Sequence, residues 1–176
     1  MNGPILSIIT VNFNNNLGLL KTLESVSSQS FSSYEHIIID AGSTDGSRET
    51  IIQYEKENPH LSFWSSESDK GIYDGMNKGI DHAKGQYLYF LNSGDCLSQD
   101  ILAKIPFDGT EYLYGDTILF YKRKTKKRVY PDTLDLIYLS DNSLHHQSCF
   151  IPCLKIKDMT LITKSYLIGH IVSSAL

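Results

Sequence analysis

The sequence has few cysteines, no long apolar run and no excess of basic residues. Its three cysteines, Cys96, Cys149 and Cys153, form neither a disulfide framework nor a zinc-site spacing, so they are interpreted as buried or idle thiols of a reducing cytosol. No segment approaches the roughly 20 apolar residues of a membrane span, and the N-terminal apolar run is too short for a signal peptide. A formal net charge of −4 argues against general nucleic-acid binding. We therefore expect one cytoplasmic domain, since 176 residues suffice for a substantial core.

Strand-like and helix-like segments alternate through the first half of the chain. Continuous apolar runs predict buried strands at 5–11, 35–40, 61–64 and 87–91. Apolar residues at helical spacing predict intervening helices at 17–26, around 51–54, and at 72–83. Strands separated by helices of this size imply right-handed crossovers and a mostly parallel sheet, so the predicted fold class is α/β.

Each predicted strand ends in polar residues. The apolar run Tyr87–Leu91 stops abruptly at Asn92–Asp95, and the other three strands end at Thr10–Asn12, Asp40 and Ser65–Glu67. A single carboxylate in such a place is most often a turn or capping residue. Four polar ends along one edge of a parallel sheet predict a binding site, because α/β sheets bind ligands at the carboxyl ends of their strands.

Two glycine-containing clusters lie between the strands. Gly42–Gly46 lacks the Lys-Ser/Thr of a phosphate-binding P-loop, and we interpret it as a tight turn that caps the next helix through Ser43 or Thr44. The cluster Asp69–Gly79 places acids and lysines at a strand-to-helix junction, where Gly71 would allow a ligand to approach the backbone.

The second half of the chain is less regular. A strand-like segment at 111–121 is interrupted by Gly115–Asp116, and the basic run Lys122–Arg128 follows it. With Val129–Tyr130 as the return strand, these segments predict a β-hairpin with a basic tip, and residues 132–139 predict a short helix. The basic run is either a solvated tip or a peripheral contact with anionic lipid headgroups at the inner face of the membrane.

Four motifs in order resemble the successive signatures of family 2 glycosyltransferases, most closely the branch that builds bacterial surface polysaccharides. They are Ser7–Asn14, Ile39–Gly46, Asp69–Asp74 and Phe90–Asp95. The resemblance implies a GT-A fold, which is a Rossmann-like, mostly parallel sheet flanked by helices, and inverting transfer from a nucleotide-sugar donor. The single domain 1–176 then divides into a nucleotide-sugar-binding half (5–95), an acceptor-side half (96–155) and an atypical C-terminal segment (156–176).

The resemblance also implies roles for particular residues. Asn92–Asp95 matches the DxD-type motif of the family, and Asp95 aligns with its metal-binding acid, so this carboxylate and the donor phosphates would hold Mg²⁺ or Mn²⁺. The residues expected to bind the nucleotide sugar are Thr10, Asn12 and Asp40 at the base, Asp69, Lys70 and Gly71 beside them, Asn92, Gly94 and Asp95 in the motif, and His146 and Gln147 near the phosphates.

The chain departs from the family pattern where the family supplies its general base. The family draws this base from an acid followed by an aromatic residue, whereas residues 161–176 contain no acid. We therefore assign no catalytic residue, and expect a truncated or frameshifted transferase that transfers poorly to a lipid-linked or saccharide acceptor, unless Asp116 or Asp141 serves as base. The alternative is a nucleotide-sugar-binding protein without turnover.

Overall fold

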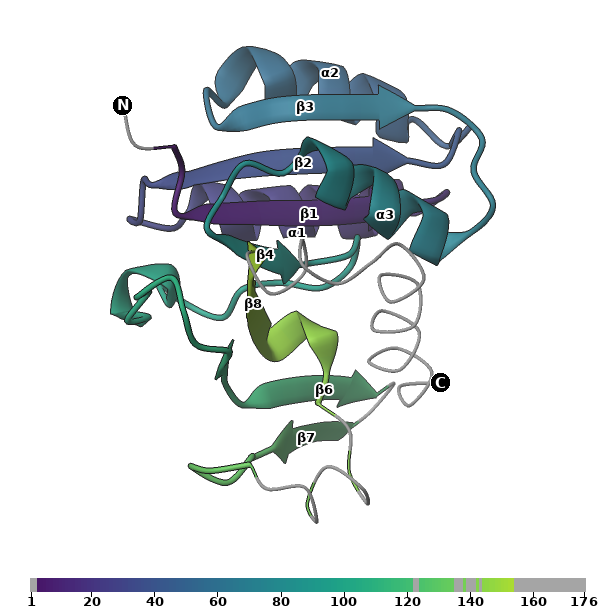
Figure 1. Ribbon diagram of the computed structural model, residues 1–176. Helices are drawn as coiled ribbons and strands as arrows, with labels where there is room; N and C mark the ends of the chain where they lie inside the picture. Colours follow the sequence, from purple (N-terminus) through teal and green to yellow (C-terminus); the bar gives the residue numbers. More distant parts are fainter. Residues whose placement is uncertain (1–2, 122–123, 135–137, 139–141, 143, 154–176) are drawn as a thin grey trace.

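The structure is a computed structural model that describes residues 3–121, 124–134, 138, 142 and 144–153. Its main sheet has six strands in the order β3-β2-β1-β4-β8-β5 (Figure 1). The strands are β1 (Leu6–Asn12), β2 (Tyr34–Asp40), β3 (Leu61–Ser66), β4 (Tyr87–Phe90), β5 (Leu113–Tyr114) and β8 (Cys149–Pro152). Strands β1 to β4 are parallel, and β8 and β5 are antiparallel to their neighbours, which confirms the predicted mostly parallel sheet.

Three helices cover the two faces of this sheet. They are α1 (Asn16–Ser27), α2 (Ser47–Glu57) and α3 (Ile72–His82). Helices α1 and α2 pack on one face, and α3 covers the opposite face in front of β1 and β2 (Figure 1). The predicted strand and helix positions of the first half are confirmed. Continuous apolar runs form strands here because helices bury both faces of the sheet.

Close packing of α3 on the sheet depends on glycine. A Cβ atom at Gly79 would overlap the side chain of Ile9, and one at Gly75 would lie 2.8 Å from Cγ1 of Val11. The helix therefore lies directly against β1, and its first turn follows the loop that contains Asp69. This contact brings that loop back over the carboxyl end of β1.

The start of α2 differs from the prediction. Its N-cap is Gly46, at φ +93°, and no side chain caps it. Ser43 instead turns toward Asp40, while the Asp45 carboxylate accepts hydrogen bonds from the Ser47 N–H and hydroxyl, at 3.2 and 2.6 Å. The predicted capping by Ser43 or Thr44 is therefore wrong, because Ser43 is bound to the end of β2.

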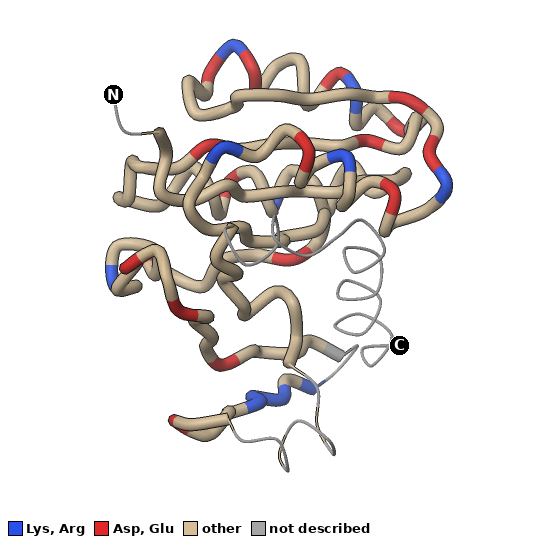
Figure 2. The backbone as a smooth tube through the Cα atoms, viewed as in Figure 1, with Lys and Arg blue, Asp and Glu red and all other residues tan. Residues whose placement is uncertain are grey.

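A hairpin projects from the main sheet, as predicted, but its return strand lies earlier in the chain than the predicted Val129–Tyr130. It consists of β6 (Thr117–Tyr121) and β7 (Lys124–Arg128), which form a separate antiparallel pair. The basic run is thus the return strand from Lys124 onward and not only the tip (Figure 2). Most of β7 is exposed, so the lysine side chains stay hydrated while the backbone of the strand pairs with β6.

Two predicted segments fall outside the described residues in part or in full: half of the expected helix at 132–139 and all of the C-terminal segment at 156–176. The two short 3₁₀ turns that the structure does contain are η1 (Leu102–Lys104) and η2 (His146–Ser148). In the part of the chain that the structure describes, the helices are too short or too polar to cross a bilayer.

Candidate functional site

The carboxyl ends of β1 and β2 are joined side chain to side chain. Asn12 and Asp40 are partners in the strand register, and the Asn12 amide donates a hydrogen bond of 2.7 Å to the Asp40 carboxylate. Both side chains are buried. Asn12, predicted at the nucleotide base, and Asp40, predicted near it, are therefore brought together at one point of the sheet edge.

The Asp40 carboxylate is saturated with hydrogen bonds. Besides Asn12, it accepts from the Ser43 N–H at 2.9 Å, from the Ser43 hydroxyl, and from the Ser66 hydroxyl at 2.7 Å. Burial acts to raise the pKa of Asp40, but the hydrogen bonds from Ser43, Ser66 and Asn12 outweigh it and hold the pKa below its usual range. Asp40 is therefore a stable, ionised anchor that ties the ends of β1, β2 and β3.

Thr10 lies on β1 two residues before Asn12, further from this edge of the sheet. Its side chain is fully buried, and its hydroxyl donates to the Leu91 carbonyl at 2.8 Å and lies 2.9 Å from Nε2 of His36. Thr10, a residue predicted at the donor, is thus buried with its hydroxyl bonded to protein groups. Its contacts position the end of β4.

The motif after β4 forms a tight turn. The Asp95 N–H donates to the Asn92 carbonyl at 2.9 Å, and Gly94 has a φ of +100°. A β-turn with positive φ at its third residue requires glycine or asparagine there. The turn is fastened to β1 by the hydrogen bond of 3.1 Å from the Ser93 N–H to the Val11 carbonyl.

Two hydrogen bonds connect this turn to a segment more than 50 residues later. Gln147 donates to the Asp95 carboxylate at 3.1 Å, and Asn92 contacts Nε2 of His146 at 3.1 Å. Burial raises the pKa of Asp95, and the Gln147 hydrogen bond only partly offsets this. Burial also lowers the pKa of His146 to about 4, so its ring is neutral. Four of the residues predicted near the donor phosphates thus lie together.

The loop that precedes α3 supplies the remaining predicted residues. The Asp69 carboxylate accepts a hydrogen bond of 2.8 Å from the Gly71 N–H, and Gly71 has a φ of +114°. A Cβ atom at Gly75 would lie 3.2 Å from Oδ2 of Asp69, which places this carboxylate beside the end of β1. Lys70 is exposed, and its backbone N–H donates to Asp74 at 3.2 Å.

Several buried polar atoms at this edge have no hydrogen-bond partner among the described residues. Four of them belong to predicted donor-binding residues: Oδ1 of Asn12, Oδ2 of Asp69, Oδ1 of Asn92 and Nδ1 of His146. Buried polar atoms are nearly always satisfied in folded proteins because leaving them unpaired costs free energy. Their concentration along one edge is the property expected of a site that binds a polar ligand.

The site contains few groups that could bind a metal. In the described part of the chain, no three His, Cys, Asp or Glu side chains are close enough to hold an ion together. Asp95 fits a site in which a ligand supplies most of the oxygen atoms around the cation. Its carboxylate accepts a hydrogen bond from one described donor, Gln147, and its pKa is raised because this bond does not offset the effect of burial. Asp40 does not fit, since four donors already surround it.

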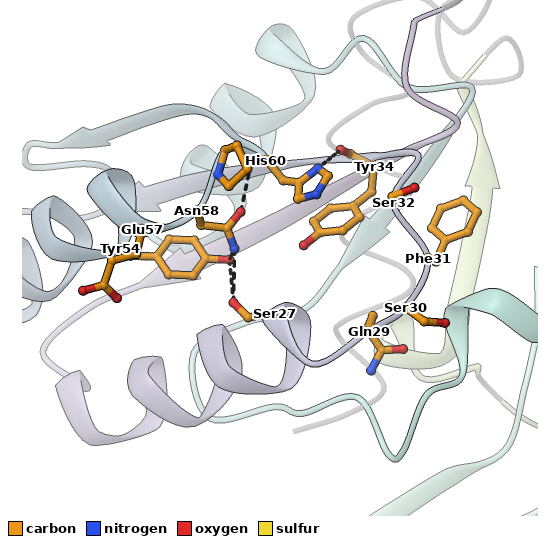
Figure 3. Close-up of a pocket in the computed structure, with 11 residues that line it drawn as sticks. Ser27, Gln29, Ser30, Phe31, Ser32, Tyr34, Tyr54, Glu57, Asn58 and His60 are labelled. Atoms are coloured by element: carbon orange, nitrogen blue, oxygen red, sulfur yellow. Dashed lines mark hydrogen bonds between the residues drawn. The ribbon is translucent and has the colours of Figure 1, made fainter.

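A concavity lies at the opposite, amino edge of the sheet. It measures about 410 Å³ and lies between the ends of α1 and α2 and the start of β2 (Figure 3). Its polar groups mostly bond to one another: Asn58 donates to Tyr54 at 2.7 Å and to Ser27 at 3.1 Å, while His60 contacts the Tyr34 carbonyl at 3.2 Å. None of the residues predicted to bind the donor lines it.

The arrangement described above is that of a GT-A-type α/β domain with unpaired polar side chains at the strand ends. The chain belongs to glycosyl transferase family 2, since the sequence model of that family matches residues 7–149. This confirms the family inferred from the four motifs.

Curated relatives of the chain are named as glycosyltransferases. An uncharacterized glycosyltransferase of Mycobacterium tuberculosis is 42% identical over 103 residues, covering 57% of this chain and 38% of the relative. TuaG of Bacillus subtilis, whose name assigns it to teichuronic acid biosynthesis, is 37% identical over 57% of this chain and 40% of its own length. A PGL/p-HBAD biosynthesis glycosyltransferase of Mycobacterium bovis is 30% identical over 68% and 49%. The chain thus spans at most about half the length of these relatives.

Solved structures with the same fold are also glycosyltransferases. Staphylococcus aureus TarS, residues 1–349, matches with a TM-score of 0.66 and 17% identity over 87% of this chain and 48% of its own. The mannosyltransferase PcManGT of Pyrobaculum calidifontis matches with a TM-score of 0.52 and 18% identity over 56% and 30%. At these identities the likeness establishes the fold.

Sequence reasoning missed residues that support the site. Ser43 was assigned to helix capping, although it holds Asp40, and Thr22 on α1 was given no role, although it contacts the turn at Asn92–Asp95. Ser66 lies in a polar strand end that the sequence did indicate. For Thr22 the signal would have been a polar residue on an otherwise buried helix face.

Proposed function

We propose that the chain is the donor-binding part of an inverting glycosyltransferase, in which the carboxyl edge of the sheet binds a nucleotide sugar and Asp95 binds its divalent cation. The observation that carries the proposal is Asp95 itself, a poorly compensated carboxylate at the end of β4, linked through Gln147 to the neutral His146 segment. PcManGT, which shares the fold, is described in complex with GDP-Man and Mn²⁺, and this supports a diphosphate and cation at the same edge.

The roles of the other residues follow from their free atoms. Asn12 and Asp69 each present an unpaired oxygen near the end of β1, which can accept N–H or O–H groups of a nucleoside. Asn92 and His146 lie on the other side of β1, next to Asp95, where a diphosphate would lie. Gly71 and Gly94 allow close approach of the ligand to the backbone.

Bound Mg²⁺ or Mn²⁺ would offset the charge that develops on the departing nucleoside diphosphate. The contribution of the chain is to hold a carboxylate in a fixed position and to keep it ionised. Gln147 serves the second purpose, because its hydrogen bond favours the charged form of Asp95.

Sugar transfer also requires a base that activates the acceptor hydroxyl, and this typically contributes about 10²–10⁴-fold in rate. Asp116 is a poor base, because its carboxylate pairs with Lys127 at 2.8 Å and accepts from the Tyr130 N–H, contacts that lower its pKa. Asp141 and residues 156–176 lie outside the described residues. We therefore retain the second proposal, donor binding with little or no transfer to a lipid-linked or saccharide acceptor.

We further propose that β7 approaches anionic lipid headgroups. Lys124, Lys126 and Lys127 are exposed on this strand, Lys127 in an ion pair with Asp116, and Phe120 on β6, opposite Thr125, is 82% exposed. Replacing the three lysines by serine should reduce sedimentation with vesicles that contain anionic lipid, since each basic residue near such a surface contributes about 1 kcal/mol. Equal partitioning of both forms would contradict this contact.

The main test is nucleotide binding by the 176-residue chain. Calorimetry with UDP and GDP, with Mn²⁺ or with EDTA, should show an affinity that depends on the metal. Asp95→Asn should abolish the metal-dependent part, whereas Asp100→Asn is the matched control, since its carboxylate bonds to Ser30 in the loop after α1. Unchanged metal dependence in Asp95→Asn would refute the proposed metal ligand.

The same protein decides between the two functional proposals. Incubation with a panel of nucleotide sugars and lipid-linked or saccharide acceptors would give product if the chain is a transferase. Donor binding without product would establish the binding protein without turnover. Absence of nucleotide binding under all conditions would overturn both proposals.

A further inference from the structure

Helix α1 has a polar face that does not face solvent. Thr22 and Ser25 lie at helical spacing on one side of the helix, and Gln29, in the loop just after the helix ends, extends this face by donating a hydrogen bond of 3.1 Å to the Ser25 carbonyl. All three side chains bond to the backbone of the segment 92–102, which follows β4. A helix far away in sequence thus holds the chain on which Asp95 lies.

The contacts of Thr22 are concentrated on the turn itself. Its hydroxyl oxygen lies 2.8 Å from the Asp95 carbonyl and 3.3 Å from the Asn92 carbonyl, and it accepts the Gly94 N–H at 3.0 Å. The Thr22 side chain is fully buried. A hydroxyl has one hydrogen to donate, so the short contact to the Asp95 carbonyl is its principal donation.

The two other polar residues of this face hold the chain after the turn. The Ser25 hydroxyl accepts the Leu97 N–H at 3.2 Å. Gln29 donates to the Gln99 carbonyl at 2.7 Å and accepts the N–H groups of Ile101 and Leu102 at 3.0 and 3.1 Å. These bonds fix where the segment leaves the site, whereas Thr22 fixes the turn.

The turn needs an internal support because glycine makes it adaptable. Gly94 adopts a φ of +100°, and glycine reaches many other conformations at little cost. The turn is also held at Ser93, whose carbonyl accepts from Asn15, the N-cap of the same helix, at 3.0 Å. Thr22 is the described side chain that contacts both ends of the turn and its glycine.

We propose that Thr22 is a positioning residue for the nucleotide-binding site: its hydroxyl holds the Asn92–Asp95 turn in the one conformation that aims the Asp95 carboxylate at the cation. This inference rests on the proposed function. Residues that orient a metal ligand without touching the metal typically contribute about 10–100-fold to metal affinity.

The test compares variants that keep or lose the hydroxyl. Thr22→Val preserves the shape and removes the hydroxyl, Thr22→Ala removes it without filling the site, and Thr22→Ser keeps it. Thr50→Val is the matched control, since it removes a hydroxyl that bonds to Asn16 at the start of α1. Each protein is titrated with UDP and GDP, with Mn²⁺ and with EDTA, and amide exchange is measured at Gly94.

We expect Thr22→Val and Thr22→Ala to lose about 10–100-fold of the Mn²⁺-dependent affinity, with unchanged affinity in EDTA. Amide exchange at Gly94 should accelerate in both variants, and Thr22→Ser should restore both properties. Wild-type metal-dependent affinity in the two variants would overturn the inference. An equal loss of affinity with and without Mn²⁺ would also overturn it, because that result indicates general structural damage.

Failure of the proposed function is recognised separately. If the wild-type chain shows no Mn²⁺-dependent nucleotide binding, the proposed function is wrong, whatever Thr22 does. Amide exchange at Gly94 needs no ligand, so it still tests the structural half of the inference. Unchanged exchange in Thr22→Val and Thr22→Ala would show that the hydroxyl does not hold the turn.

Discussion

Two aspartates in this domain lie at strand ends, and the protein surrounds their carboxylates in opposite ways. Asp40, after β2, is fully buried and accepts four hydrogen bonds, and its pKa is lowered. Asp95, after β4, accepts one side-chain hydrogen bond, from Gln147, among the described residues, and its pKa is raised. One carboxylate is therefore compensated by the protein, whereas the other retains charge that a ligand can neutralise.

The difference separates a structural acid from a candidate functional acid. Donors around Asp40 join three strand ends, so its ionised form stabilises the fold. The charge of Asp95 is disfavoured by burial, which is the environment in which a divalent cation would bind with most gain. The comparison can be tested by neutralising each acid.

The largest effect is expected for Asp40→Asn. The amide brings its own N–H donors against those of Asn12 and Ser43, and hydrogen bonds to charged groups contribute about 1.5–3 kcal/mol each. The free energy of unfolding should fall by about 3 kcal/mol or more. In urea denaturation, Asp95→Asn should be neutral or stabilising by comparison, because its ionised form is disfavoured in the folded state. Equal destabilisation of both variants would contradict the distinction.

An intermediate effect concerns acid stability. Burial lowers the pKa of His36 to about 3 and that of His146 to about 4, so both are neutral in the folded protein. The unfolded chain takes up these protons near pH 6.5. Stability should therefore fall as the pH decreases below about 6.5, by about 1 kcal/mol per pH unit and histidine, until the folded pKa values are reached.

Denaturation at pH 7, 6 and 5 would measure this slope. His36→Gln should reduce this slope and leave the part due to His146, whatever its effect on stability at pH 7, because the glutamine side chain does not titrate. A wild-type stability that does not change between pH 7 and pH 5 would contradict the inferred neutral histidines.

The smallest effect is expected for Gln147→Leu. Loss of this hydrogen bond should raise the pKa of Asp95 further, since the bond favours the carboxylate form. Mn²⁺-dependent nucleotide binding requires the carboxylate, so its loss at acid pH should begin at a higher pH than in the wild type. Gln53→Leu on the exposed side of α2 is the control and should not shift the midpoint. An unshifted midpoint in Gln147→Leu would remove Gln147 from the site.

The sequence was sufficient for the first half of the fold because its segments are locally consistent. A continuous apolar run such as Ile5–Val11 must be buried, and its length suits a strand. Leu19, Leu23 and Val26 define a single buried face on α1. The sequence placed the return strand of the hairpin after the basic run instead of within it, because lysine is depleted in strands. On an exposed two-stranded ribbon that preference carries little weight, so Lys124–Arg128 pair with β6.

By itself the sequence determined the α/β order, the family and the set of polar residues at the strand ends, since these depend on local pattern and spacing. Only the tertiary structure decided that Thr10 faces the interior, that Asp40 is saturated and Asp95 is not, and that Thr22 supports the turn. These properties depend on which donors reach each carboxylate from distant segments. Hydrogen-bond partners such as Gln147 become neighbours of Asp95 only when β8 pairs with β4.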